Sequence, residues 1–289
     1  MKRSALLFIP AMVILVGLGL VSHHIKTPGS NKILPKHASA MRIMTWNVHH
    51  FQPLKGKSKI LTHQMLKLID SVNPDILCLQ EYYDQTNRRI DITDSIKRIM
   101  HTEYAYFQPV KKKYTGIAIF SKYPIIYKKN LNNSMTACDQ CIIADILIHG
   151  RVQRVYALHL QSYFLPLKQA GQSDLTYAAS VVNSLKMGFI KRSRQVNQLS
   201  KEIRTSPYPV ILTGDFNDPP ASYTFHKLSK GLINTFKEQG SGYGSTYAES
   251  LLPFQIDYIL VPKNTQVQHY RVVRQKLSDH YPVVADISK

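Results

Sequence analysis

Short apolar runs alternate with polar turns along most of the chain. Many of these runs are rich in β-branched residues and are bounded by Pro, Gly or Asp, which predicts buried strands. Two of them, 142–148 and 152–160, flank His149-Gly150 and predict a hairpin. The predicted strands cover 41–48, 75–81, 116–121, 124–126, 142–148, 152–160, 210–212, 256–261, 269–274 and 283–287.

A helical period occurs in the segments between these strands. From Leu61 to Val72 apolar residues recur every three or four positions, and Pro74 ends the helix that this spacing predicts over 57–73. Other helices are expected around 92–99, at 174–205 with an interruption at Gly188, and at 221–229. A chain of 289 residues has room for two small domains or one large one.

The first 22 residues predict a membrane anchor. Residues 5–21 contain no charged residue and follow a basic start at 1–4. This length is at the lower limit for crossing a bilayer, so a secretory signal peptide is the alternative. The basic start favours a cytoplasmic N-terminus. We therefore expect a single-pass protein of the cell membrane, with a linker at 23–40 and a folded domain at 41–289 outside the cytoplasm, or a secreted protein if the segment is cleaved.

The chain is strongly basic. It has 37 Lys and Arg against 18 Asp and Glu, which gives a formal net charge of +19. Such a charge attracts polyanions, including nucleic acid, anionic lipid head groups and phosphorylated metabolites. The charge predicts an anionic partner but does not choose among these classes.

The three cysteines do not make a disulfide framework. Cys78 lies in an apolar run and is expected in the core. Cys138 and Cys141 form a single C-x-x-C, which is a weak zinc signal without a second pair of ligands. A small disulfide outside the cytoplasm and a plain loop are the other interpretations, and we favour the loop.

The most informative stretch is 209–220, where a short buried strand leads into Gly214, Asp215 and Asn217. On an extended chain, residues two apart point to the same side, so the strand would present a carboxylate and an amide to one pocket. A carboxylate can deprotonate a water, and an amide can donate to a developing oxyanion. Taken alone, the same residues are also typical of an ordinary strand-to-turn junction.

Further polar residues lie at or near the ends of other apolar runs. Together they indicate one rim of a β-rich core lined with oxygen ligands and imidazoles. The few carboxylates among them suit a Mg²⁺ site, where waters and a substrate phosphate complete the coordination. Zinc is less favoured, because the sequence has no tight His/Cys cluster. The residues are Asn47, Glu81, His159, Asp215 with Asn217, Asp257, and Asp279 with His280.

The order and spacing of these motifs resemble the endonuclease/exonuclease/phosphatase superfamily, also called deoxyribonuclease-I-like, and most of all a bacterial membrane-anchored branch. The resemblance covers residues 41–289, and it implies a catalytic domain with an α/β fold. That fold is a four-layer α/β/β/α sandwich of two packed, mainly antiparallel sheets flanked by helices. The motifs are Thr45-Trp46-Asn47-Val48, Leu79-Gln80-Glu81, Ala157-Leu158-His159-Leu160-Gln161-Ser162, Gly214-Asp215-Phe216-Asn217, Ile256-Asp257-Tyr258 and Ser278-Asp279-His280-Tyr281-Pro282.

The resemblance also implies a metal site. Glu81 matches the principal metal ligand of the family, and Asp279 matches a second acidic residue near the metal. Asn47 matches the amide that helps to hold the metal and its water network. The implied ion is Mg²⁺, with Mn²⁺ as an alternative.

The resemblance assigns catalytic roles to five further residues. Asp215 matches the residue that positions or deprotonates the attacking water, and Asn217 matches its partner at the phosphoryl group. His159 matches a phosphate-contacting residue. His280 matches the histidine at the scissile phosphate, and Asp257 matches the carboxylate that orients it. An Asp–His pair of this kind fixes the imidazole tautomer and keeps the ring charged.

The chain departs from the nuclease pattern at one position. Nuclease branches often carry an acid two residues after the strand-end Asn, where this chain has His49, followed by His50. We expect these two histidines to face solvent or to pack. The sequence thus favours a monomeric metal-dependent phosphodiesterase, most of all a nuclease. A sphingomyelinase-like lipid phosphodiesterase or inositol-phosphate phosphatase is the alternative, and a non-catalytic polyanion-binding module ranks third.

Overall fold

The computed structural model describes residues 35–52, 58–83, 91–110, 115–131, 140–162, 173–249 and 255–288. The segment predicted at 1–22 and the linker up to residue 34 lie outside these ranges. Among the residues that are described, no helix is both long and apolar enough to cross a membrane.

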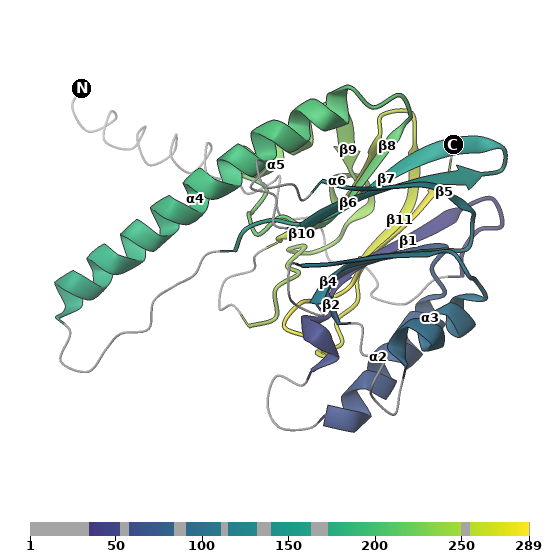
Figure 1. Cartoon of the computed structure of the whole chain (residues 1–289), viewed down its shortest axis with the longest axis horizontal. Helices are drawn as coiled ribbons and strands as arrows, with labels where there is room; N and C mark the ends of the chain where they lie inside the picture. The colour runs from purple at the N-terminus through teal and green to yellow at the C-terminus, as the bar shows by residue number, and fades with distance from the viewer. Residues whose placement is uncertain are drawn as a thin grey trace, which may run out of the picture.

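The described strands form two six-stranded sheets that pack face to face (Figure 1). The first has the order β11-β12-β1-β2-β4-β3, and the second has the order β5-β6-β7-β8-β10-β9. Neighbouring strands are antiparallel except for β1–β2 and β7–β8, which are parallel. The bounds are β1 Met41–Asn47, β2 Ile76–Tyr83, β3 Ala105–Pro109, β4 Thr115–Ser121, β5 Ile125–Asn130, β6 Gln140–Ile148, β7 Arg151–His159, β8 Val210–Asp215, β9 Leu232–Asn234, β10 Asp257–Pro262, β11 Gln266–Val272 and β12 Val283–Ser288.

Helices cover the outer face of each sheet (Figure 1). The bounds are η1 His49–Phe51, α2 Ser58–Val72, α3 Ile92–Met100, α4 Asp174–Arg204, α5 Tyr223–Leu228 and α6 Thr235–Gln239. Helices α2 and α3 share a hydrophobic cluster with the first sheet, and α4 and α5 share one with the second. The layers are therefore α/β/β/α, as the resemblance implied.

Alternation along the strands builds the core. In β1, Ile43 faces the cluster between the two sheets, whereas Met44 and Trp46 face the helices. Both faces of the strand are apolar because both are covered, and this explains the continuous apolar runs in the sequence. Cys78 is fully buried between the sheets, which confirms the expected core position.

Some sequence predictions need correction. Helix α4 is continuous through Gly188, because one glycine costs only about 1 kcal/mol and packing of the C-terminal half outweighs it. Strands β3 and β9 and helix α6 were not predicted; both strands are short and lie at sheet edges. Cys141 lies buried in β6 instead of in a loop, while Cys138 is outside the described residues.

Gly214 sets the close approach of β7 and β8. Its φ is +128°, and a Cβ atom there would lie 2.0 Å from the carbonyl oxygen of Leu158. Only glycine fits this position, both for its backbone angle and for its contact. The close approach keeps the two strands paired to their ends, where His159 lies opposite Asp215.

Candidate active site

The second sheet places three predicted site residues side by side. His159 ends β7, Asp215 ends β8, and Asp257 begins β10. Asp215 is the register partner of both His159 and Asp257. The three residues therefore lie next to one another on adjacent strands, at one end of those strands. The β-sheet register thus produces the convergence that the strand-end pattern predicted.

Glu81 projects from an irregular point at the end of β2. The register with β4 shifts between Leu79 and Tyr82, and Glu81 has a φ of +49°. A β-bulge of this kind turns a side chain away from the regular sheet direction. The carboxylate stays 25% exposed, so it remains accessible to a ligand.

The amide of Asn47 joins the two sheets. Its Nδ2 atom lies 3.2 Å from Oε1 of Glu81 and 3.3 Å from Oδ2 of Asp215. Because both neighbours are carboxylates, the NH₂ group must face them, and Oδ1 accepts from the backbone N–H of His49 at 3.2 Å. Asn47 therefore holds the two carboxylates together, and only its Oδ1 atom has lone pairs for a metal.

His280 is fixed by the end of β1 and by Asp257. The indole N–H of Trp46 donates to the His280 carbonyl oxygen over 2.9 Å, and the hydroxyl of Ser278 donates to the Asn47 carbonyl oxygen over 2.8 Å. Nδ1 of His280 donates to Oδ2 of Asp257 over 2.9 Å. Its Nε2 then points to Oδ2 of Asp215, 3.7 Å away.

Burial and charge change the acid–base properties of this group. Burial raises the pKa of Asp215 above its ordinary value; His280 and His159 oppose this rise, and Asp257 adds to it. Burial alone would lower the pKa of His280, but the carboxylates of Asp257, Asp215 and Asp279 raise it to about 10. The imidazole is therefore held as a cation between carboxylates.

Oxygens of Asp215 and Asp257 and a nitrogen of His280 lie within 4.8 Å of one another, close enough to hold a metal ion. However, Nδ1 of His280 is used in the bond to Asp257, and the raised pKa favours a proton on Nε2 as well. A protonated nitrogen has no lone pair for a metal. The buried group of Asp215, Asp257 and His280 is therefore better suited to proton transfer. The more exposed carboxylate of Glu81 is better suited to binding a cation.

Glu81 has an imidazole on each side. Nε2 of His50 lies 3.4 Å from Oε2, and Nε2 of His159 lies 3.9 Å from Oε1. His159 also lies 3.6 Å from Oδ2 of Asp215. This set of a carboxylate, imidazoles and the amide oxygen of Asn47 fits a divalent cation.

Asp279 is half-buried beside His280. Its Oδ1 atom lies 3.0 Å from the Ser278 hydroxyl oxygen, and its backbone carbonyl oxygen accepts from the N–H of Ala248 at 2.7 Å. Its charge helps to raise the pKa of His280. Asp279 therefore lies close enough to His280 to act on its charge, and its role beside a metal stays a prediction.

The position of Asn217 differs from the sequence argument. The chain is no longer extended there, because Asn217 has a φ of +52°. Its backbone N–H donates to Oδ1 of Asp215 over 2.8 Å, and its side-chain NH₂ donates to the carbonyl oxygen of Leu160 over 2.9 Å. Asn217 thus orients Asp215 and joins the ends of β7 and β8, and it does not point from an extended strand.

Two nearby residues were not assigned to the site from the sequence. The ring of Tyr247 packs edge-on against His280 at 5.1 Å, and its pKa is raised by burial and by Asp279. Tyr247 lies in a loop without regular spacing, so no sequence pattern indicates it. His50, which we expected to pack or face solvent, contacts Glu81; the departure at His49-His50 was the available signal.

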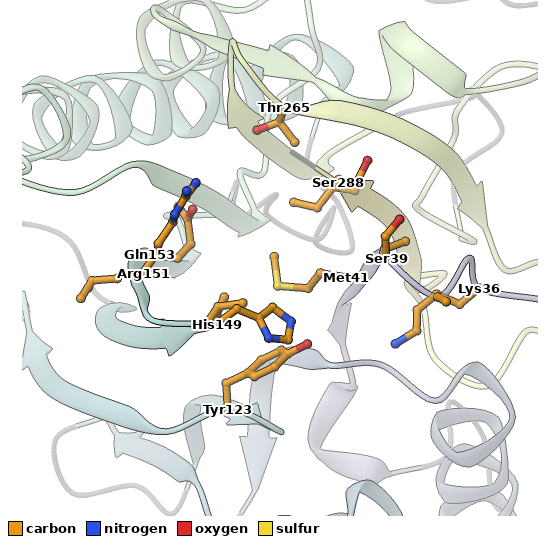
Figure 2. Close-up of a pocket in the computed structure, with 14 residues that line it drawn as sticks. Lys36, Ser39, Met41, Tyr123, His149, Arg151, Gln153, Thr265 and Ser288 are labelled. Carbon is orange, nitrogen blue, oxygen red and sulfur yellow. The ribbon is translucent and has the colours of Figure 1, made fainter.

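A separate cavity lies at the opposite ends of the same strands (Figure 2). It has a volume of about 500 Å³ and lies between the start of β1, the β6–β7 turn and the end of β12. Met41, Tyr123, His149 and Arg151 are among its lining residues, and no predicted site residue is. The cavity therefore does not belong to the candidate active site.

Comparisons with known proteins identify the family. The sequence profile of the Endonuclease/Exonuclease/phosphatase family matches residues 44–280. The chain belongs to this family, whose members include nucleases, phosphatases and phosphodiesterases and typically use divalent metals. No curated protein matches the chain in sequence.

Solved structures share the fold. A humanized TDP2 from D. rerio matches with a TM-score of 0.63 and 15% identity, over 87% of this chain and 100% of that one. The human Nocturnin catalytic domain with bound sulfate matches with a TM-score of 0.61 and 18% identity, over 88% and 96%. A mannosyl-6-phosphatase from Bacteroides thetaiotaomicron matches with a TM-score of 0.58 and 16% identity, over 86% of this chain and 100% of that one. These likenesses confirm the predicted sandwich.

Proposed function

We propose that the protein is a divalent-metal-dependent phosphoesterase that hydrolyses phosphodiester bonds, with nucleic acid as the substrate. The observation that carries this proposal is the row of contacts from Asp257 through His280 to Asp215, which Asn47 links to Glu81. At one end of the strands, this row combines the buried base Asp215, the imidazole of His280 in a fixed orientation, and the partly exposed carboxylate of Glu81.

Asp215 supplies the base for the attacking water. Its Oδ1 accepts from the N–H of Asn217, which leaves Oδ2 facing Asn47 and the two imidazoles of His159 and His280. This arrangement fixes the carboxylate in one orientation, from which Oδ2 takes the proton of a water.

His280 and His159 contact the phosphoryl group of the substrate. Asp257 accepts from Nδ1 of His280 and thereby aims Nε2–H into the site, where it donates to a phosphoryl oxygen. Nε2 of His159 lies 3.6 Å from the same Oδ2 atom of Asp215 and serves as a second contact for the phosphoryl group. A divalent cation bound at Glu81 would supply further charge neutralisation for the phosphoryl oxygens.

Two features support nucleic acid. The net charge of +19 favours a polyanion. Aromatic rings also lie next to His280: Tyr247 packs against it, and Tyr281 lies under the guanidinium of Arg274, 5.0 Å from its centre. Aromatic and cationic side chains placed together are typical of surfaces that bind single nucleic-acid strands.

The test uses the full-length protein and its Asp215→Asn variant. Supercoiled plasmid, single-stranded DNA, RNA, sphingomyelin vesicles and inositol phosphates are each incubated with Mg²⁺, Mn²⁺ or EDTA. We expect cleavage of nucleic acid that EDTA abolishes and that Asp215→Asn reduces at least about 100-fold.

Each other outcome has a definite meaning. Metal-dependent turnover of sphingomyelin or inositol phosphates alone would keep the chemistry and replace the substrate class. Absence of turnover on every substrate, from protein that is folded and binds Mn²⁺, would contradict the proposed function.

A further inference from the structure

The segment after β1 has an unusual backbone. His49, His50 and Phe51 have φ values of +44°, +59° and +53°, so three consecutive non-glycine residues are left-handed. Such a conformation costs about 1–2 kcal/mol per residue for an L-amino acid. Hydrogen bonds from the N–H of Phe51 to Val48 and from the N–H of Gln52 to His49 close the turn, and Phe51 is buried.

This turn places the ring of His50 against Glu81 at two points. Nδ1 of His50 lies 3.1 Å from the backbone carbonyl oxygen of Glu81, and Nε2 lies 3.4 Å from its Oε2 atom. The side chains of both residues are partly exposed, at 31% and 25%. The imidazole therefore spans from the main chain of Glu81 to its carboxylate, at the open side of the site.

The first contact fixes the tautomer. A carbonyl oxygen only accepts, so Nδ1 of His50 must carry the proton. In the neutral ring, Nε2 then has a lone pair directed at a carboxylate oxygen, which also has lone pairs. Two acceptors at this distance need a cation between or beside them, either a proton on Nε2 or a metal ion.

We propose that His50 is a metal ligand, and that its Nε2 atom and the carboxylate of Glu81 bind the same divalent cation. An imidazole whose other nitrogen donates to a backbone carbonyl is the common form of a metal-binding histidine. This inference rests on the proposed function, because it adds a nitrogen ligand to the cation site of that function.

A nitrogen ligand changes which ion the site prefers. Mg²⁺ favours oxygen ligands, whereas imidazole suits later transition ions, and Mn²⁺ accepts both. A site with Glu81 and His50 therefore binds Mn²⁺ in preference to Mg²⁺. The left-handed turn would then serve to hold the imidazole in place for the ion.

The experiment measures Mn²⁺ binding and its ligands directly. Isothermal titration gives the Kd for Mn²⁺ and Mg²⁺, and electron spin-echo spectroscopy of bound Mn²⁺ detects a ligated ¹⁴N nucleus. The variants are His50→Gln, His50→Gly, His49→Gln and His159→Gln in the full-length protein. Glycine suits the positive φ at residue 50, so His50→Gly removes the ring and keeps the turn.

We expect a ¹⁴N signal in the wild-type protein that both His50 variants lose and that His49→Gln and His159→Gln keep. Loss of an outer partner of a metal ligand typically costs 10–100-fold in affinity, so loss of a ligand should weaken Mn²⁺ binding at least about tenfold. Mg²⁺ binding should weaken less, so the preference for Mn²⁺ falls.

Failure of this inference differs from failure of the proposed function. Mn²⁺ bound without a ¹⁴N signal, or with one that survives in both His50 variants, would show that His50 is not a ligand of the ion; the metal-dependent chemistry would stand. If the wild-type protein binds neither ion, both proposals fail.

Discussion

His280 donates from Nδ1 to Oδ2 of Asp257 over 2.9 Å, and this bond connects the two sheets. Asp257 begins β10 in the second sheet, and His280 lies just before β12 in the first. Both side chains are almost fully buried, and the second carboxylate oxygen of Asp257, Oδ1, has no hydrogen-bond partner among the described residues. The same hydrogen bond therefore both joins the two sheets and aligns the imidazole of His280.

This pair should act as a unit in catalysis. Asp257→Asn is expected to lower kcat about 10²- to 10⁴-fold, because the amide does not hold His280 as a charged donor. His280→Gln should have a similar effect, and the double variant should be scarcely worse than either single one. Steady-state kinetics of the four proteins test this. Losses that multiply in the double variant would show that the residues act independently.

The same pair predicts a pH dependence of stability without metal. His280 faces Asp257, Asp215, Asp279 and the ring of Tyr247. Its pKa rises from about 6.5 unfolded to about 10 folded. The group is protonated more readily in the folded state, so its stabilisation is complete below about pH 6.5 and is lost as the pH rises towards 10.

Urea unfolding in EDTA, at about pH 6 and pH 9.5, measures this effect as the difference in unfolding free energy between wild type and His280→Gln. The difference should be larger at the lower pH. An equal difference at both values would show that His280 has the same pKa in the folded and unfolded states.

Gly214 should be intolerant of any side chain. Gly214→Ala places a Cβ atom 2.0 Å from the carbonyl oxygen of Leu158 at a positive φ, so we expect a loss of about 3 kcal/mol or more. Gly150→Ala is the matched control, because Gly150 also has a positive φ but no atom lies within 4 Å of its added Cβ. That variant should lose only about 1 kcal/mol. Similar losses in both would mean that β7 and β8 can separate without cost.

Arg192 anchors α4 to the turn after β8. It is fully buried and makes two 2.9 Å hydrogen bonds to Asp218. Arg192→Met should destabilise the protein by about 3–5 kcal/mol, because the carboxylate is left buried without its main partner. The more exposed pair Lys129–Glu202 provides the comparison, and Lys129→Met should cost at most about 1 kcal/mol. Thermal and urea unfolding measure both, and a loss below 1 kcal/mol in Arg192→Met would contradict this role.

Much of the site could be predicted from the sequence because strand ends are local features. Asp215, His159 and Asp257 each border an apolar run, and sheet register then aligns them without further information. The relation of Asp257 to His280 is not local, and only the family resemblance indicated it before the structure.

Other features depend on backbone angles that residue type alone does not specify. Asn217 is left-handed, so the two-residue alternation fails there, although Asn tolerates such angles better than most residues. His50 reaches Glu81 only because three left-handed residues and a β-bulge occur together. Neither the position of Asn217 nor the contact of His50 with Glu81 follows from a periodic pattern in the sequence. The short strands β3 and β9 were missed because none of their residues is fully buried, so neither forms a run of core positions.

The most direct test of metal-dependent water activation by Asp215 is the hydrolysis of bis(p-nitrophenyl) phosphate by wild type and Asp215→Asn, each with Mn²⁺ and with EDTA. We predict turnover by the wild-type protein that stops in EDTA and falls at least about 100-fold in Asp215→Asn, with Mn²⁺ binding retained. Equal rates in the two proteins, or a rate that EDTA leaves unchanged, would contradict a metal-dependent phosphodiesterase in which Asp215 activates the water.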